Sequence, residues 1–487
     1  MATDYEGVIG LEIHAQLLTE TKIFCGCSTR PGRPPNTQVC PVCLGLPGAL
    51  PVLNARAVDL ALRAACALGS RIHRSSVFAR KNYFYPDLPK GYQISQYDRP
   101  LATGGRLDAD VAGPPYPVGI VRVHLEEDAG KSLHEGFTDS DRRTYVDFNR
   151  SGVPLIEIVS RPDLRSAADA ADFFRRLREL LVAIGVTDGN MELGSLRCDA
   201  NVSVRPAGAE EFGTRTEIKN LNSFRFLQKA LDYEIRRQVE VLRAGDRVLH
   251  DTRLWDVAGG RTVPMRSKEE AHDYRYFPEP DLPPLELSVE RVDAVRNWLP
   301  ELPDRRRLRL VSEHGLSGAD AVLFTQTYAG LDRYFVEVAA AAGDTRSTAN
   351  WIRGEVVRKM NETGTDETGR FAERIPAERL GRLIRLADEG VINGPTAKDV
   401  FEKMYATLRP PDDIISTEGL AQIDDAAALL QIVKDVLERH PGPLAEYRRG
   451  RAAVFGFFVG QVIKASGGKA NPKLVNELLR RELGGTA

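Results

Sequence analysis

Residues 9–17 read Ile-Gly-Leu-Glu-Ile-His-Ala-Gln-Leu, an alternation of apolar and polar side chains that is typical of a β-strand. Successive side chains of a strand point to opposite faces of its sheet. Glu12, His14 and Gln16 are therefore predicted to share one face, while the apolar residues between them face a core.

Other segments of the same region extend this sheet. Residues 120–126 and 154–159 also read as strands. One long helix is predicted to begin at the capping box Ser166-Ala-Ala-Asp169 and to end near Gly185. A second is predicted over residues 223–244. Strands separated irregularly by long helices favour an α+β sheet domain over a doubly wound sheet.

Proline clusters mark the domain boundaries. Prolines gather at 278–284 and again at 298–303, the pattern beyond them is helical to about residue 408, and Pro410-Pro411 opens a last helical unit. We therefore expect a sheet domain at 1–290, an all-α helical domain at 291–408 and an all-α tail at 409–487. A chain of 487 residues is long enough for two to four domains.

The composition is that of an ordinary soluble globular protein, with 42% hydrophobic and 28% charged residues. No apolar run approaches the roughly 18 residues needed to span a bilayer. The first residues, Met-Ala-Thr-Asp-Tyr-Glu, lack the basic and apolar regions of a signal peptide. We therefore expect a cytoplasmic protein without a membrane partner. The net charge of −2 excludes an overall positive surface, but it leaves local basic patches for nucleic acid open.

Four cysteines lie in two close pairs, with twelve residues between the pairs: Cys25, Cys27, Cys40 and Cys43. Two such pairs can place four thiolates around one tetrahedral zinc ion. In a reducing cytoplasm a zinc knuckle at 25–43 is a better interpretation than disulfides. Four protein ligands leave no position for substrate, so the zinc would be structural. The alternative is a set of cysteines with only a packing role.

Acidic residues and one histidine form a candidate cation site. Glu12 and His14 share a strand face, as two ligands of one ion require. Glu126-Glu127-Asp128 follows a predicted strand and Glu157 lies within another, where an unpartnered carboxylate would be costly. Magnesium suits such oxygen ligands and also binds nucleotide phosphates. Alternation places Glu126 and Glu127 on opposite faces, so the sequence leaves open which of them binds the ion. A solvated strand face and an exposed acidic turn are the alternatives.

Residues 80–96 are dense in aromatic, amide and cationic side chains, which can stack a base or ribose and hold phosphate oxygens. Ordinary packing of an aromatic-rich loop is the alternative. The segments 194–203 and 217–225 add arginine, lysine and amide side chains. Because the chain lacks a P-loop motif and a Gly-x-Gly-x-x-Gly motif, those two nucleotide folds are disfavoured. It also lacks a Gly-x-Ser-x-Gly elbow, so we do not expect it to hydrolyse an amide itself.

Six motifs together resemble one family, the B subunits of aspartyl/glutamyl-tRNA amidotransferases (GatB). They run in order along nearly the whole chain and occupy residues 8–14, 80–87, 124–131, 194–203, 273–281 and 456–466.

The resemblance implies a component of the heterotrimeric GatCAB complex. In that complex GatA releases ammonia from glutamine, and GatC braces GatA against GatB. GatB uses ATP to activate the side-chain carboxylate of Glu-tRNA(Gln) or Asp-tRNA(Asn), and then amidates it. The fold implied is a catalytic domain similar to glutamine synthetase, a helical domain and a YqeY-like tail that engages tRNA. Which tRNA is the physiological substrate stays open.

Carried over by position in the motifs, the resemblance implies magnesium ligands at Glu12, His14 and Glu127, and catalytic residues at Lys81, Glu127 and Glu157. The four cysteines correspond to a zinc site that part of the family carries. Residues expected to contact ATP are Arg80, Tyr83, Tyr85, Arg197 and Asn201. Residues expected to contact tRNA phosphates are Lys464, Lys469 and Arg480.

Two other functions are compatible with parts of this pattern. The chain could be only a tRNA-binding scaffold, but the acid cluster and the loop around Lys81 argue against that. It could instead be a free-standing ligase for small acids similar to glutamine synthetase, but the helical tail argues against it.

Overall fold

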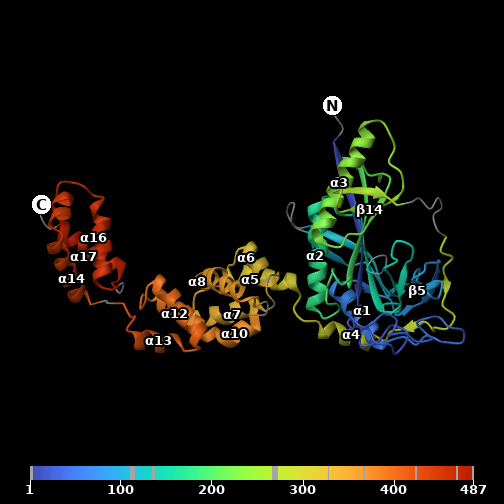
Figure 1. Cartoon of the computed structure of the whole chain (residues 1–487), viewed down its shortest axis with the longest axis horizontal. Coiled ribbons are helices and arrows are strands. Elements are labelled where there is room, and N and C mark those ends of the chain that lie inside the picture. Colours follow the sequence, from blue (N-terminus) through green and yellow to red (C-terminus); the bar gives the residue numbers. More distant parts are fainter. Residues whose placement is uncertain are drawn as a thin grey trace. The chain divides into compact units, whose positions relative to one another are not determined.

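The computed structural model describes residues 4–109, 116–133, 136, 138–265, 273–326, 328, 330–365, 368–422, 425–467 and 470–484. The chain divides into two compact units, residues 1–302 and 303–487, each with its own core (Figure 1). Among the described residues, no helix combines the length and apolar character needed to cross a membrane.

Strand β1 (Tyr5–Gln16) is central to the sheet of the first unit, as the alternation in residues 9–17 predicts. Thirteen strands of the described part join this sheet, and its main path runs β15-β14-β13-β12-β1-β11-β8-β5-β4-β16. The pairs along the path are antiparallel except for β13 and β14. The mostly antiparallel order confirms the α+β prediction.

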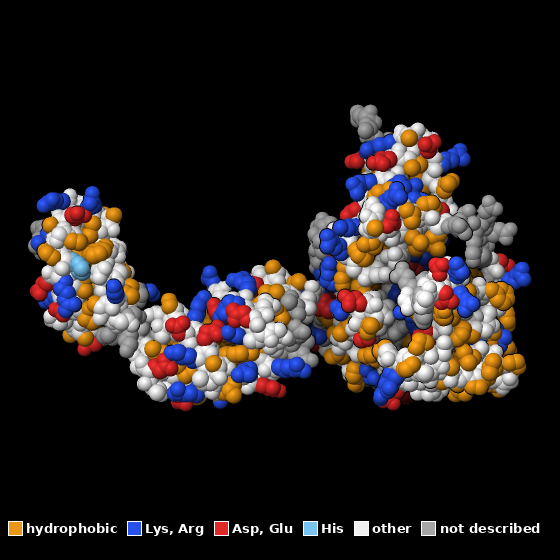
Figure 2. Space-filling model, viewed as in Figure 1, with side chains coloured by type: hydrophobic (Ala, Val, Ile, Leu, Met, Phe, Trp, Pro, Cys, Tyr) orange, Lys and Arg blue, Asp and Glu red, His pale blue; other side chains and the backbone are white. Residues whose placement is uncertain are grey.

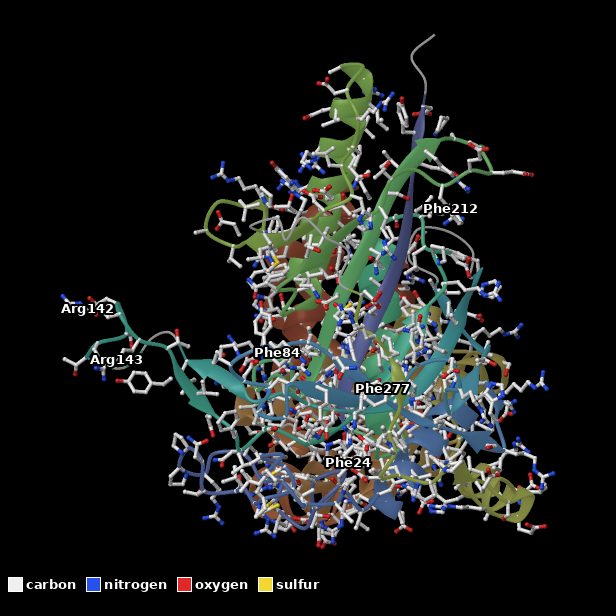
Figure 3. The ribbon with its side chains drawn as sticks, turned by 90° about the vertical axis from the view of Figure 1, so that its right-hand side faces the viewer. Phe24, Phe84, Arg142, Arg143, Phe212 and Phe277 are labelled. Atoms are coloured by element: carbon white, nitrogen blue, oxygen red, sulfur yellow. The ribbon has the colours of Figure 1, made fainter. Side chains whose placement is uncertain are left out.

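The other strands of the path have these bounds: β4 (Phe78–Asn82), β5 (Tyr92–Gln96), β8 (Tyr116–Glu127), β11 (Pro154–Ser160), β12 (Leu196–Pro206), β13 (Thr216–Lys219), β14 (Thr252–Asp256), β15 (Arg261–Pro264) and β16 (Phe277–Pro278). Short strands at its side are β2 (Arg71–Ile72), β6 (Ala102–Thr103) and β7 (Arg106–Ala109). Two separate ribbons pair β3 (Ser75–Ser76) with β17 (Leu285–Glu286), and β9 (Lys131–Leu133) with β10 (Tyr145–Asp147). Arg142 and Arg143, which precede β10, lie away from the sheet (Figure 3).

The sheet has one apolar and one polar face. Ile9, Leu11 and Ile13 are buried in a core that also contains side chains of three helices. These are α1 (Ala55–Ala67), α2 (Ala167–Ala183) and α3 (Phe224–Arg243). The opposite face carries Glu12, His14 and Gln16, each of them partly buried.

Both long helices of this unit begin at serine caps. The Ser166 hydroxyl accepts the backbone N–H of Asp169 and donates to its carboxylate, so the predicted capping box is confirmed. Ser223 caps α3 by accepting the N–H of Phe226. The chain turns after α3 at Gly245, whose φ of 82° favours glycine.

The first unit continues past the boundary that we predicted at residue 290. Helix α4 (Val289–Trp298) packs on α1 instead of starting the helical region. The Arg63 guanidinium lies 3.4 Å from the ring centre of Trp298, and Arg291 bonds Asp59 at 2.7 Å. The unit therefore ends at Leu302. The proline cluster at 278–284 lies within the unit, and the cluster at 298–303 coincides with its end.

The second unit is helical and contains two hydrophobic cores. The first core is built by α5 (Pro303–His314), α6 (Gly318–Gln326), α7 (Leu331–Ala342), α8 (Thr345–Trp351), the π-helical turn η1 (Ile352–Val356), α9 (Val357–Thr363), α10 (Thr368–Arg374), α11 (Ala377–Asp388), α12 (Gly394–Thr407) and α13 (Pro411–Glu418). The second is built by α14 (Ala426–Arg439), α15 (Pro441–Arg448), α16 (Val454–Ala465) and α17 (Pro472–Gly484). Ile414 and Ile415 on α13 belong to the first of these cores, so it extends beyond the predicted boundary at 408.

Candidate active site

Four ionisable side chains converge on the polar face of the sheet. The strand register places His14 on β1 opposite Glu157 on β11, and Glu157 opposite His124 on β8. His14 Nε2 lies 3.4 Å from Glu157 Oε2 and 3.4 Å from Glu126 Oε1. His124 Nε2 lies 3.2 Å from Glu157 Oε2 and 3.8 Å from Glu126 Oε2. We call His14, His124, Glu126 and Glu157 the central cluster.

Opposite charges hold the central cluster together. Burial alone would lower the pKa of His14, but the hydrogen bond to Glu157 and the charge of Glu126 outweigh it, and the pKa is raised. Burial also opposes the shift at His124, where Glu157 and Glu126 raise the pKa to about 9. The pKa of Glu157 lies well below its usual range, because His124 and His14 outweigh its burial.

Glu12 lies on the same face as the central cluster, two residues before His14. Its Oε1 accepts a hydrogen bond from Asn201 Nδ2 at 2.9 Å. Burial, and then the charges of Glu157 and Glu217, raise the pKa of Glu12. A bound cation would reverse this effect, since it would favour the ionised carboxylates.

The side chains present fit a divalent cation. One ligand atom each from His14, Glu126 and Glu157 lies within 4.8 Å of the others. Two ligands bound to one Mg²⁺ at about 2.1 Å lie about 3 to 4 Å apart in an octahedral arrangement. The site could therefore close on an ion by small side-chain movements. Its carboxylate oxygens suit magnesium, and the imidazole is compatible with a transition metal as well.

Glu127 lies on the other side of the sheet, which corrects its predicted place among the magnesium ligands. Its carboxylate pairs with Lys90 Nζ and accepts the backbone N–H of Ile94 at 2.8 Å. Both charged side chains are buried, and they line a cavity of about 210 Å³ beside the cysteine loop. The reason is the period of the strand: adjacent residues of β8 face opposite ways, so only Glu126 reaches His14.

Arg197 on β12 lies beside the central cluster, and Asn201 on the same strand contacts Glu12. That both contact ATP stays a prediction. Arg197 is opposite His14 in the register, and its Nη2 donates to Asp128 Oδ1 at 2.9 Å. The other oxygen of Asp128 accepts from Gln16 Nε2 at 2.9 Å. Asp128 therefore orients the guanidinium at the border of the site.

Lys81 is also on the polar face. It pairs with Gln93 in the register, and Ser95 on the same side of β5 pairs with Glu126. Its ammonium lies 4.8 Å from the ring centre of Tyr274 and 5.7 Å from that of Tyr83. Within the described residues, Lys81 has no ion pair, so its charge is available to an anion.

The other predicted ATP contacts of this loop divide between the two faces. Arg80 alternates away from the site, where Nε and Nη2 donate to Glu279 at 2.6 and 2.7 Å. The structure thus corrects its placement in a nucleotide site. Tyr83 lies with Lys81, and burial together with the charge of Glu126 raises its pKa. Tyr85 is half exposed, with its ring 6.5 Å from that of Tyr83.

The four cysteines meet as predicted for a zinc knuckle. One sulfur of each lies within 4.8 Å of the others, and the Sγ atoms of Cys40 and Cys43 are 3.9 Å apart. Thiolates at about 2.3 Å from a tetrahedral zinc are about 3.8 Å apart. The hydrogen bond from Cys25, aided by the nearby Lys22 ammonium, lowers the pKa of Cys43 to about 4. The donor set therefore fits structural zinc, away from the polar face.

Comparisons with known proteins decide the family. A family profile described as the GatB/GatE catalytic domain matches residues 7–293, and one described as the GatB domain matches residues 333–483. The chain belongs to the GatB family. Its relatives include the B subunit of aspartyl/glutamyl-tRNA(Asn/Gln) amidotransferase from Thermodesulfovibrio yellowstonii, 52% identical over 98% of both chains. The proteins of the same name from Myxococcus xanthus and Geobacter sulfurreducens are 51% and 52% identical, over at least 99% of each chain.

The predicted tRNA contacts of this GatB-family chain lie on the last two helices. Lys464 on α16 and Arg480 on α17 are exposed, and the Arg480 guanidinium lies 5.9 Å from the ring of Phe455. Lys469 lies outside the described residues. Basic side chains are spread among acidic ones on the visible face of these helices (Figure 2). This part of the assignment stays a prediction.

Four residues for which the sequence predicted no role also lie at the site of this GatB-family chain. His124 joins the central cluster, and Arg122 Nη2 lies 3.7 Å from Glu157 Oε1. Strand alternation alone could have placed both beside Glu126. Tyr274 and Tyr276 reach the site from a segment far along the chain, and only the tertiary pairing of β16 with β4 brings them there.

Proposed function

We propose that this chain uses ATP to activate the side-chain carboxylate of tRNA-bound glutamate or aspartate, and that it then amidates this carboxylate with ammonia. The activity is that of a glutamine-dependent ligase, in which the chain acts as the GatB component of an amidotransferase complex. The observation that carries the proposal is the convergence of His14, Glu126 and Glu157 on the polar face of the sheet. Membership of the GatB family gives the reaction class.

The chemistry explains why such a site is needed. A carboxylate resists ammonia because its charge repels the nucleophile and because an oxide is a poor leaving group. Transfer of the γ-phosphoryl group of ATP to a carboxylate oxygen gives an acyl phosphate and ADP. Ammonia then attacks the carbonyl carbon, the C–O bond to the phosphate breaks, and the amide and inorganic phosphate are released. Magnesium, when bound, neutralises charge on the phosphoryl oxygens.

The residues of the polar face have distinct roles in this proposal. His14, Glu126 and Glu157 would hold magnesium, with Glu12 as a further ligand that Asn201 orients. Lys81 would attract phosphate oxygens with its ammonium, which the rings of Tyr83 and Tyr274 position. Arg197, fixed by Asp128, would bind an anionic group of the substrate or nucleotide. Glu127 has no place in this metal site.

The proposed partner subunits, substrate tRNAs and zinc site are those of the family. We propose a cytoplasmic heterotrimer with a glutaminase subunit, GatA, and with GatC, and a tRNA(Gln) or tRNA(Asn) substrate charged with Glu or Asp. The sheet unit would resemble glutamine synthetase, zinc on the four cysteines would fold the loop at 25–43, and the YqeY-like tail would engage tRNA. The relatives are named as one subunit of an amidotransferase, which supports a complex of several chains.

The test is amidation by the chain purified with its co-expressed partner subunits. We expect formation of Gln-tRNA(Gln) or Asn-tRNA(Asn) to require ATP and magnesium and to be lost in Glu157→Gln. Release of ammonia from glutamine should persist in that variant. Glu290→Gln, a change at an exposed acid on α4, is the matched control. Loss of ammonia release together with amidation, or amidation without ATP, would contradict the proposal.

A further inference from the structure

Tyrosines from two distant segments meet at the edge of the polar face. Tyr97 directly follows β5, and Tyr274 and Tyr276 precede β16. The rings of Tyr97 and Tyr276 are stacked, with 4.0 Å between centres and 6° between planes. The ring of Tyr274 is 6.1 Å from that of Tyr276 and 5.9 Å from that of Tyr83. An aromatic surface thus extends from Tyr97 to Tyr83.

This aromatic surface adjoins the central cluster. Ser95, two residues before Tyr97, donates to Glu126 Oε2 at 3.4 Å. The phenol of Tyr276 is close enough to Glu126 and Glu157 for their charges to add to the effect of burial and raise its pKa. A ligand stacked on this surface would therefore have its charged groups next to the proposed magnesium ligands and Lys81.

The segment that carries Tyr276 is fixed by the strand next to it. The backbone N–H of Asn82 donates to the carbonyl oxygen of Tyr274 at 3.0 Å, and Asn82 Nδ2 donates to that of Arg275 at 2.8 Å. Arg275 has a φ of 47°, in the left-handed region that few residues other than glycine adopt. The bonds from Asn82 hold this turn and aim Tyr276 at Tyr97, so the platform is formed before any ligand binds.

The outer ring of the stacked pair is available to a ligand. Tyr97 is 49% exposed, although a large aromatic side chain is usually buried more completely. One face of its ring lies against Tyr276, and the other face can accept a flat ring. By contrast, Tyr83 is enclosed with Lys81, so its ring is less suited to stacking than we expected from the sequence.

We propose that Tyr97, supported by Tyr276, is a stacking platform for an adenine base. The inference rests on the proposed function, because both substrates of that reaction carry an adenine: ATP, and the 3′-terminal adenosine of the tRNA. Base–aromatic stacking is sequence-tolerant and strong enough to position a nucleotide. The ammonium of Lys81, which lies farther along the aromatic surface at 4.8 Å from the ring centre of Tyr274, would attract the phosphates of the same nucleotide.

The experiment measures binding to the purified complex. Affinities are determined for ATP, and for two uncharged tRNAs that differ only in the presence of the 3′-terminal adenosine. The variants are Tyr97→Ala, Tyr276→Ala and the conservative Tyr97→Phe. Phe212→Ala is the matched control, because Phe212 is 64% exposed and lies apart from Phe84 and Phe277, which flank this region (Figure 3). Thermal unfolding of each variant excludes misfolding.

The measured affinities show whether Tyr97 is a stacking platform and which adenine it binds. A roughly tenfold weaker affinity for ATP in Tyr97→Ala, with Tyr97→Phe unchanged, assigns the platform to the adenine of ATP. If Tyr97→Ala no longer binds the complete tRNA more tightly than the truncated one, the platform binds the 3′-terminal adenosine of the tRNA. If both affinities in the two alanine variants stay within about twofold of those in Phe212→Ala, the inference is overturned. A wild-type complex that binds these ligands but amidates no tRNA would overturn only the proposed function.

Discussion

His14 and Glu157 face each other across β1 and β11, with 3.4 Å between Nε2 and Oε2. Neither residue is near the other in the sequence, and each lies on a strand whose opposite side is buried in the core. The apolar half of each strand thus fixes where the polar half points. A register shift of one residue in either strand would turn its side chain into the core. The positions of the His14 and Glu157 side chains therefore depend on the packing of the sheet against its core.

The two neighbouring acids of β8 are expected to respond differently to loss of charge. Glu126→Gln removes a proposed magnesium ligand, so ATP-dependent amidation should fall by at least about 100-fold. Its unfolding temperature should fall less than that of Glu127→Gln, because Glu157 still pairs with both histidines of the central cluster. Glu127→Gln leaves the buried ammonium of Lys90 without its counter-charge, which costs about 3 kcal/mol or more. Amidation assays and thermal unfolding of both variants separate the two roles. Equal unfolding temperatures would contradict the burial argument.

Zinc is expected at one ion per chain, measured by elemental analysis of the purified complex. Cys43→Ser should lose the metal and lower the unfolding temperature, since structural zinc contributes on the order of 10 kcal/mol to folding. Cys66→Ser is the control, because Cys66 lies outside the four-cysteine group. A wild-type protein without zinc, or a zinc content unchanged in Cys43→Ser, would refute the assignment.

Glu234 should make stability depend on pH. It is buried on α3, where it accepts from Arg237 at 2.5 Å and from Thr262 at 2.7 Å. Burial raises the pKa of this carboxyl, but the hydrogen bonds from Arg237, Gln238 and Thr262 outweigh it and hold the pKa below its usual value. Its stabilisation is then complete above the unfolded-state pKa of about 4.3 and is lost as the pH falls through the folded-state value.

The expected result is that Glu234→Gln destabilises the protein by about 2 to 4 kcal/mol at pH 7, and that this difference shrinks as the pH falls below the unfolded-state pKa. Unfolding of both proteins is followed across this range. A difference that stays constant as the pH falls would show that the carboxylate charge is not the cause.

Phosphate contacts by the tail should appear in the salt dependence of tRNA binding. Lys464→Ala and Arg480→Ala should each weaken binding and reduce the slope of log K against log salt by about 1. Lys434 on α14, also exposed, provides a control for general loss of charge. If the slopes match those of wild type and of Lys434→Ala, these two side chains do not contact phosphates.

Local patterns in the sequence predicted much of the fold. Alternation in residues 9–17 predicts β1 and its two faces, and the capping box at Ser166 predicts the start of α2. The cysteine spacing predicts the four-sulfur group. These features depend on backbone periodicity, capping and short loops, which neighbouring residues determine.

Pairing between strands that are far apart in the sequence determines the positions of several site residues, and local patterns do not predict it. The sequence does not show which of Glu126 and Glu127 lies beside His14, because that depends on the pairing of β8 with β11. It also does not show that Arg80 bonds Glu279, because that depends on the pairing of β16 with β4. Tyr276 enters the site by the same pairing. The assignment of α4 to the first unit depends on its packing against α1, which no local pattern predicts.

The most direct test of the account is the anomalous scattering of crystals of the complex grown with Mn²⁺, as a substitute for Mg²⁺, and a non-hydrolysable ATP analogue. We predict a manganese peak bound at roughly 2.1 Å by His14, Glu126 and Glu157, with the triphosphate on the same ion. A peak beside Glu127 and Lys90, or a triphosphate bound away from the polar face of the sheet, would contradict it.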